Sequence, residues 1–88
     1  MQLARVIGTV VSTRKDDALI GFKLLVLQVE DPQSGEDAER LVAVDTVGAG
    51  VGERVLVARG GAARTTLPIN APTDAAIVGI VDTVDTVP

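Results

Sequence analysis

The sequence predicts an all-β fold, a small five-stranded β-barrel with one or two short helical turns. Short segments rich in aliphatic and β-branched residues alternate with turn signals along the chain. No segment carries the long helical period of an amphipathic helix. Valine, alanine, leucine and isoleucine provide almost all of the 47% hydrophobic residues, and Phe22 is the only aromatic residue. This composition suits an aliphatic β-core, and 88 residues predict a single domain spanning 1–88.

The first two strands are expected at Leu3–Ser12 and Phe22–Val29. The first is rich in β-branched residues and has Gly8 at its centre, where we expect a β-bulge or the close approach of another strand. Thr13–Gly21 carries four consecutive charges before a short apolar pair and a glycine, which is typical of an exposed loop with one helical turn. In the second strand, the apolar run Leu24–Leu27 suggests burial on both faces, as in a barrel that packs against neighbouring subunits.

Two further strands are expected at Leu41–Asp45 and Glu53–Arg59. Before them, Glu30–Glu39 contains a proline, a serine, a glycine and five acids, which is typical of a solvated hairpin loop, and we assign it no chemistry. After them, small residues predict a short helical turn at Ala62–Thr66, followed by irregular chain.

The last strand is predicted at Ile77–Val84. Asp74 is expected to cap a brief turn at Ala75 and Ala76 just before it. Asp82–Val87 reads DTV twice, which is too short for a structural repeat, and we interpret it as strand patterning. Strands of this number and length fit an OB-like barrel, whose closure removes exposed sheet edges.

The composition excludes several classes of function. Eight basic and twelve acidic residues give a net charge of −4, the wrong sign for binding a nucleic-acid backbone. Without cysteine or histidine, the chain has no disulfide, no thiolate or imidazole metal ligand and no histidine-activated nucleophile, so we expect no metal and no cofactor. Arg5 interrupts the N-terminal apolar region, and no apolar run reaches the roughly 18 residues of a membrane span, so we expect a cytoplasmic protein with no membrane partner.

Partner subunits are the remaining means of stabilising so small a barrel. A chain of this length buries only about 60–65% of its unfolded surface, which leaves a lone domain marginally stable. Disulfides and metals are unavailable, so association is expected to cover aliphatic surface that one copy leaves exposed.

Three pairs of nearby acids are the candidates for acid–base chemistry: Asp16 with Asp17, Glu36 with Asp37, and Asp82 with Asp85. We interpret all three as solvated surface, and in one continuous strand Asp82 and Asp85 would face opposite sides. The basic residues are scattered along the chain, which favours solubility and interface ion pairs. A nucleic-acid-binding barrel would normally add aromatic side chains on which bases stack, and a single phenylalanine cannot supply that platform.

Gly48, Gly50 and Gly52 form a glycine corner at residues 46–53, between the third and fourth predicted strands. Their spacing is similar to that of a dinucleotide-binding fingerprint, but a phosphate site needs a helix N-terminus directly after the glycines, and here a strand follows. Two interpretations remain open. The glycines either supply positive φ angles to a loop, or they let several copies of the loop approach closely around a rotation axis.

Three segments in order, Val6–Thr13, Asp45–Arg64 and Asp74–Val84, resemble the EutN/CcmL family, the vertex proteins of bacterial microcompartments. The resemblance implies an OB-like barrel that assembles into cyclic pentamers. It further implies a place at the five-fold vertices of a polyhedral shell whose facets are tiled by a hexamer-forming protein. One departure is that many relatives read GSAAR where this chain has two glycines before Ala62, so a hydroxyl that could cap the helical turn is missing.

On this basis we expect a structural protein without catalytic residues that forms a homopentamer. Gly48, Ala49 and Gly50 are predicted to lie near the five-fold axis. A second set of residues is predicted to shape the subunit contacts: Arg64, Asp74, Ala75 and Ala76. The alternative is a monomeric OB-like domain that binds a protein or an oligonucleotide.

Overall fold

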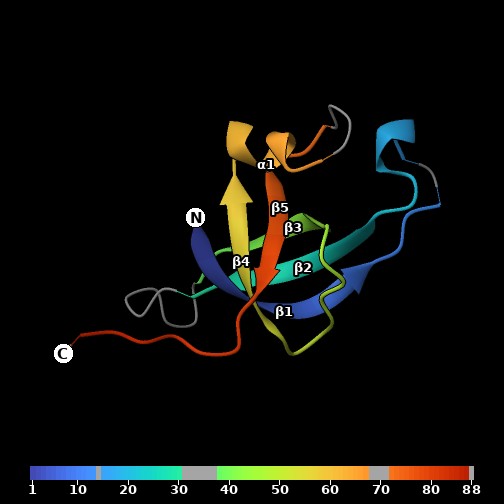
Figure 1. The fold of residues 1–88 in the computed structure, drawn as a ribbon. Helices are drawn as coiled ribbons and strands as arrows, with labels where there is room; N and C mark the ends of the chain where they lie inside the picture. Colours follow the sequence, from blue (N-terminus) through green and yellow to red (C-terminus); the bar gives the residue numbers. More distant parts are fainter. Residues whose placement is uncertain (14, 31–37, 68–71, 88) are drawn as a thin grey trace.

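In this computed structural model, which describes residues 1–13, 15–30, 38–67 and 72–87, the strands form a closed barrel (Figure 1). The elements are β1 (Gln2–Val10), the 3-10 turn η1 (Asp17–Leu19), β2 (Lys23–Val29), β3 (Arg40–Asp45), β4 (Arg54–Arg59), the short helix α1 (Gly61–Thr65) and β5 (Ala75–Ile80). Around the barrel the order is β1-β2-β3-β5-β4, and β4 pairs with β1 to close it. Only the β3–β5 pair is parallel. The predicted all-β barrel is confirmed.

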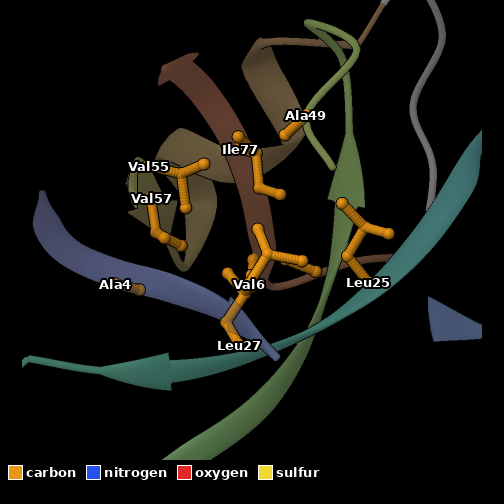
Figure 2. Packing of buried hydrophobic residues seen from close by; sticks show 10 residues of the cluster. Ala4, Val6, Leu25, Leu27, Ala49, Val55, Val57 and Ile77 are labelled. Atoms are coloured by element: carbon orange, nitrogen blue, oxygen red, sulfur yellow. The ribbon is translucent and has the colours of Figure 1, made fainter. Parts of the chain in front are cut away.

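The barrel is filled by aliphatic side chains that alternate along the strands (Figure 2). In β2, Leu25 and Leu27 are completely buried, whereas Leu24 and Val26 on the other face are half-buried. Each fully buried leucine or valine contributes about 1.5–3 kcal/mol. The inward set, small and large residues mixed as a narrow barrel requires, is Ala4, Val6, Leu25, Leu27, Ala43, Ala49, Val55, Val57, Ala75 and Ile77.

The bulge expected at Gly8 is present in β1. Val6 pairs with Leu27 and Gly8 pairs with Val26, so Ile7 is the additional residue between them. A Cβ atom on Gly8 would meet Val26 only at ordinary contact distance, so the glycine marks the bulge rather than a crowded crossing. The side chain of Ile7 is exposed on the outer face of the barrel, opposite the buried Val6.

The prediction for the last strand was wrong at both ends. Ala75 and Ala76 form no turn, because they pair with Arg59 and Ala58 and are the first residues of β5. The strand stops at Ile80, since the partner strand β4 begins only at Arg54. The amide of Val81 makes the final bond, to the Arg54 carbonyl at 2.8 Å. Asp82–Val87 therefore follows the strand instead of belonging to it.

The connections match the predictions where the structure describes them. η1 lies inside the predicted loop Thr13–Gly21, and Asp16 accepts a hydrogen bond from the amide of Ala18 at 2.9 Å. The helical turn α1 begins one residue earlier than predicted, after Gly60 with φ +63° and with no side-chain cap. Residues 31–37, most of the predicted acidic loop, lie outside the described residues.

Candidate functional site

The glycine corner is held to the barrel by one buried carboxylate, Asp45 at the end of β3. Its side chain is 1% exposed, and Oδ1 accepts hydrogen bonds from the amides of Val47 at 3.0 Å and Gly48 at 3.1 Å. Oδ2 lies 3.4 Å from the Lys23 ammonium, which also donates to the Ala49 carbonyl at 2.6 Å. An aspartate that accepts from the amide two residues on forms an Asx turn, so this residue fixes the start of the corner.

A second acid, Glu53, closes the other end of the corner. Its Oε1 accepts a hydrogen bond from the Gly50 amide at 2.7 Å, and its own amide donates to the Gly50 carbonyl at 3.1 Å. The Gly52 amide donates to the Val6 carbonyl at 2.8 Å, which joins the corner to β1. The Thr46 hydroxyl donates to the Ile77 carbonyl at 2.6 Å, so the corner is tied to β1, β2, β3 and β5.

These bonds argue against a phosphate site at the glycines. The amides of Val47, Gly48, Gly50 and Gly52, which would have to face an anion, all donate to oxygens of this chain. The next element is the strand β4 rather than a helix, so no helix dipole supports an anion here. Gly48 and Gly52 have φ angles of +85° and +93°, so backbone conformation explains these two glycines. Gly50 has no positive φ angle, so backbone conformation does not explain it.

The three residues predicted near a five-fold axis lie in different environments. The side chain of Ala49 is completely buried and points into the barrel core (Figure 2). Gly48 is exposed and Gly50 is half-exposed. At Ala49 only the backbone is available to another copy of the chain, so any close approach there depends on the two glycines.

The residues predicted at subunit contacts gather where α1 meets the start of β5. The Asp74 carbonyl accepts from the Gly60 amide at 2.8 Å, and the Arg64 guanidinium approaches the Thr73 carbonyl at 3.5 Å. Arg64 and Asp74 are exposed, whereas Ala75 is buried in the barrel core and Ala76 is buried on the opposite face of β5. Contact with another subunit is therefore open to the first two side chains, and the alanines position them.

None of the acid pairs is assembled for catalysis within the described residues. Asp16 accepts a bond inside η1, Glu36 and Asp37 lie outside the described residues, and Asp82 and Asp85 are exposed after the last strand. The described residues contain no group of three or more acidic side chains able to hold a metal ion. No helix in the described ranges is long and apolar enough to cross a membrane.

Several of the basic side chains form ion pairs with acidic side chains and do not cluster into a continuous positive surface. Arg54 donates to both carboxylate oxygens of Glu30, with distances of 2.6–2.9 Å, and Arg59 pairs with Glu39 at 3.1 Å. Hydrogen bonding from Arg54 holds the pKa of Glu30 below its usual value, and Arg5 acts in the same direction. The positive surface that an oligonucleotide would need is absent from this part of the described chain.

A groove on the outside of the barrel was not predicted from the sequence. It has a volume of about 660 Å³ and lies between the outer face of the barrel and the residues that follow β5. Its lining comprises Leu3, Arg5, Ile7, Gln28, Val29, Glu30, Ala38, Arg54, Val84 and Thr86. The sequence offered one signal, the alternation along β1, which places Leu3, Arg5 and Ile7 on the outer face opposite the buried Ala4 and Val6.

The family described as "Ethanolamine utilisation protein EutN/carboxysome" matches residues 1–82. The carboxysome shell vertex protein CcmL of Thermosynechococcus vestitus is 55% identical over 89 residues, which cover 96% of this chain and 86% of that protein. The chain belongs to the EutN/CcmL family. The resemblance stated from the three sequence segments is confirmed.

Solved structures of other members of this family have the same fold. The microcompartment shell vertex protein GrpN of Rhodospirillum rubrum is 52% identical over 99% of both chains. Its structure, described as a pentameric microcompartment shell protein, matches the full length of both chains with a TM-score of 0.84. The structure of CcmL from Gloeobacter violaceus, which is 42% identical, covers 98% of this chain and 90% of its own with a TM-score of 0.81.

Proposed function

We propose that this chain is a structural protein that forms a cyclic homopentamer and caps the five-fold vertices of a bacterial microcompartment shell. The observation that carries the proposal is the full-length likeness to GrpN, which is described as a pentameric microcompartment shell protein. Residues 1–88 act as one vertex domain in the cytoplasm. The neighbours in the shell are hexamer-forming proteins, because a flat hexagonal layer closes only where five-fold units introduce curvature.

The chemistry of the chain supports a role without catalysis. The described acids pair with arginine, lysine or backbone amides, or they lie in solvent, and the sequence holds neither histidine nor cysteine. The glycine corner uses its amides internally and offers no anion site. A barrel of this kind contributes shape and surface, which is what a shell subunit requires.

A ring of five identical subunits needs two different contact faces on each copy, since only a head-to-tail interface repeats around an axis. Within this proposal, Gly48 and Gly50 approach the axis, and Arg64 and Asp74 take part in the contacts. Gly50→Trp is then expected to disturb ring assembly, because the indole would occupy space between the copies. Unaltered pentamers of this variant would contradict that placement.

Native mass spectrometry of the purified chain tests the ring itself. The expected species has five times the 9.1 kDa mass of the single chain. A stable monomer at high concentration, or a ring of six, would overturn the proposal. Binding to purified hexameric shell proteins, followed by light scattering, tests the vertex role separately from the ring.

A further inference from the structure

Residues 82–87, here called the arm, make no hydrogen bond or ion pair with the rest of the described chain. The last hydrogen bond to the barrel is that of the Val81 amide, after which the chain continues as an irregular segment to the C-terminal end (Figure 1). Every residue of the arm is exposed, including Val84 and Val87, which are 42% and 94% exposed. The single chain therefore leaves these two apolar side chains at least partly uncovered and available to another surface.

The arm also forms one wall of the groove on the barrel. Val84 and Thr86 line one side, and Leu3 and Ile7, on the outer face of β1, line the other. The space of about 660 Å³ between these walls is open in the single chain. A small-molecule site is normally largely preformed in the free protein. The arm makes no hydrogen bond to the barrel that would hold this wall in place, so the groove is a poor candidate for such a site.

The charges in the groove indicate what fits there. Arg5 and Arg54 share a single carboxylate, that of Glu30, so the lining carries one uncompensated positive charge. Arg54 is satisfied by two-oxygen contact with Glu30. Arg5 is 50% exposed and donates to the Gly52 carbonyl at 3.0 Å, which leaves most of its five N–H donors free to meet a carboxylate.

A second copy of the chain has the matching properties. Its net charge is −4, so it has carboxylates to bring to the half-exposed Arg5. Its surface also leaves apolar side chains uncovered outside the groove, among them Ile20, Val42 and Val51. A head-to-tail ring interface joins two different surfaces of each copy, and the groove and the apolar side chains outside it can supply them.

We propose that each subunit clasps its neighbour in the ring between the arm and the outer face of β1, with Val84 and Ile7 as the apolar contacts and Arg5 as the partner of an acid on the neighbour. This inference rests on the pentamer proposed above and names the surface that joins its subunits. The arm thereby completes a groove that one chain alone leaves open.

The variant Val84→Asp tests the clasp without disturbing the barrel, because the arm is not bonded to it. Losing one central apolar anchor is expected to weaken subunit association by about 30-fold or more, seen as monomer in native mass spectrometry with an unchanged far-UV spectrum. The matched control is Val11→Asp, the same change at a valine that is 89% exposed and outside the groove lining, and it should keep the ring. Rings retained in Val84→Asp, or lost equally in both variants, would overturn the proposal.

A photo-crosslinker in place of Thr86 identifies what the arm contacts. With p-benzoylphenylalanine at this position, irradiation is expected to give covalent products of two to five chains on a denaturing gel. Cross-links confined within single chains would place the arm on its own barrel, and products formed only with an added hexameric shell protein would assign the groove to that partner. Either result overturns the clasp.

The two proposals fail in different ways. If the unaltered chain is not a pentamer, the proposed function is wrong. If the unaltered chain and Val84→Asp both form intact rings, only the clasp is wrong.

Discussion

The glycine corner and the arm are both irregular segments next to a strand, yet they differ in how the chain uses its polar groups. In the corner, four amides donate to oxygens of the same chain, and Asp45 is buried beneath them. In the arm, no residue of the described chain supplies a partner, and valines lie in solvent. The polar groups of the corner find their partners within one chain, whereas the groups of the arm remain available for contact with another chain.

This difference separates residues that stabilise the barrel from residues that join the subunits. Changes in the corner should act on the stability of the barrel, because its bonds are made within one chain. Changes in the arm should act on the ring and leave the barrel intact. Stability and assembly can therefore be measured independently in the same protein, provided that the protein concentration is fixed, since association adds to apparent stability.

The largest effect on the barrel is expected for Asp45→Ala. The substitution removes the buried acceptor of two amides and the Lys23 ammonium, and at about 1 kcal/mol for each lost interaction this costs about 2–3 kcal/mol of unfolding free energy. Urea denaturation at fixed protein concentration measures this loss. Asp45→Asn is the control, since it keeps an acceptor for the two amides and should lose less than half as much. An alanine variant as stable as the original would show that the corner does not depend on this carboxylate.

The fold could be predicted because its signals are local. β-branched runs, a glycine at the bulge and acidic or glycine-rich turns each act over a few residues, and all five strands were found. The errors came from pairing. Nothing within Ala75–Ile80 says that β4 offers partners at Arg59 and Ala58 but none beyond Arg54, and that fact decides where β5 begins and ends.

The groove and the bonds that hold the glycine corner were harder to predict, because both join residues that are distant in sequence. Glu30 and Arg54 are 24 residues apart, and Lys23 reaches the Ala49 carbonyl across 26 residues. The sequence indicated interface ion pairs but not their partners. Asp45 had a local signal, an aspartate directly before a glycine-rich turn, whereas the groove needs the barrel and the arm placed together.

A moderate effect distinguishes two glycines of the corner that the sequence treats alike. Gly48→Ala forces an L-residue to φ +85°, which costs about 1–2 kcal/mol although no atom crowds the new methyl group. Gly50→Ala has no such angle, and its Cβ would meet Glu53 at an ordinary 3.5 Å, so the change should stay within about 0.5 kcal/mol. Urea denaturation of the two variants compares them directly. Equal losses would mean that close contacts, rather than backbone conformation, select these glycines.

The smallest effect concerns the ion pair at the edge of the groove and its dependence on pH. The folded-state pKa of Glu30 is lowered by hydrogen bonds from Arg54, so the stabilisation is complete above the ordinary carboxyl pKa of 4.5 and is lost as the pH falls through the lowered value. Glu30→Gln removes this pH-dependent stabilisation, so between pH 7 and pH 3 its urea midpoint should fall less than that of the original chain.

The matched control is Glu39→Gln, at the ion pair between Glu39 and Arg59, where Glu39 is about half-exposed. This change should reduce the pH dependence of the urea midpoint by less, because solvent screens that pair more strongly. A Glu30→Gln profile parallel to the original would mean that Arg54 does not hold this carboxylate in solution.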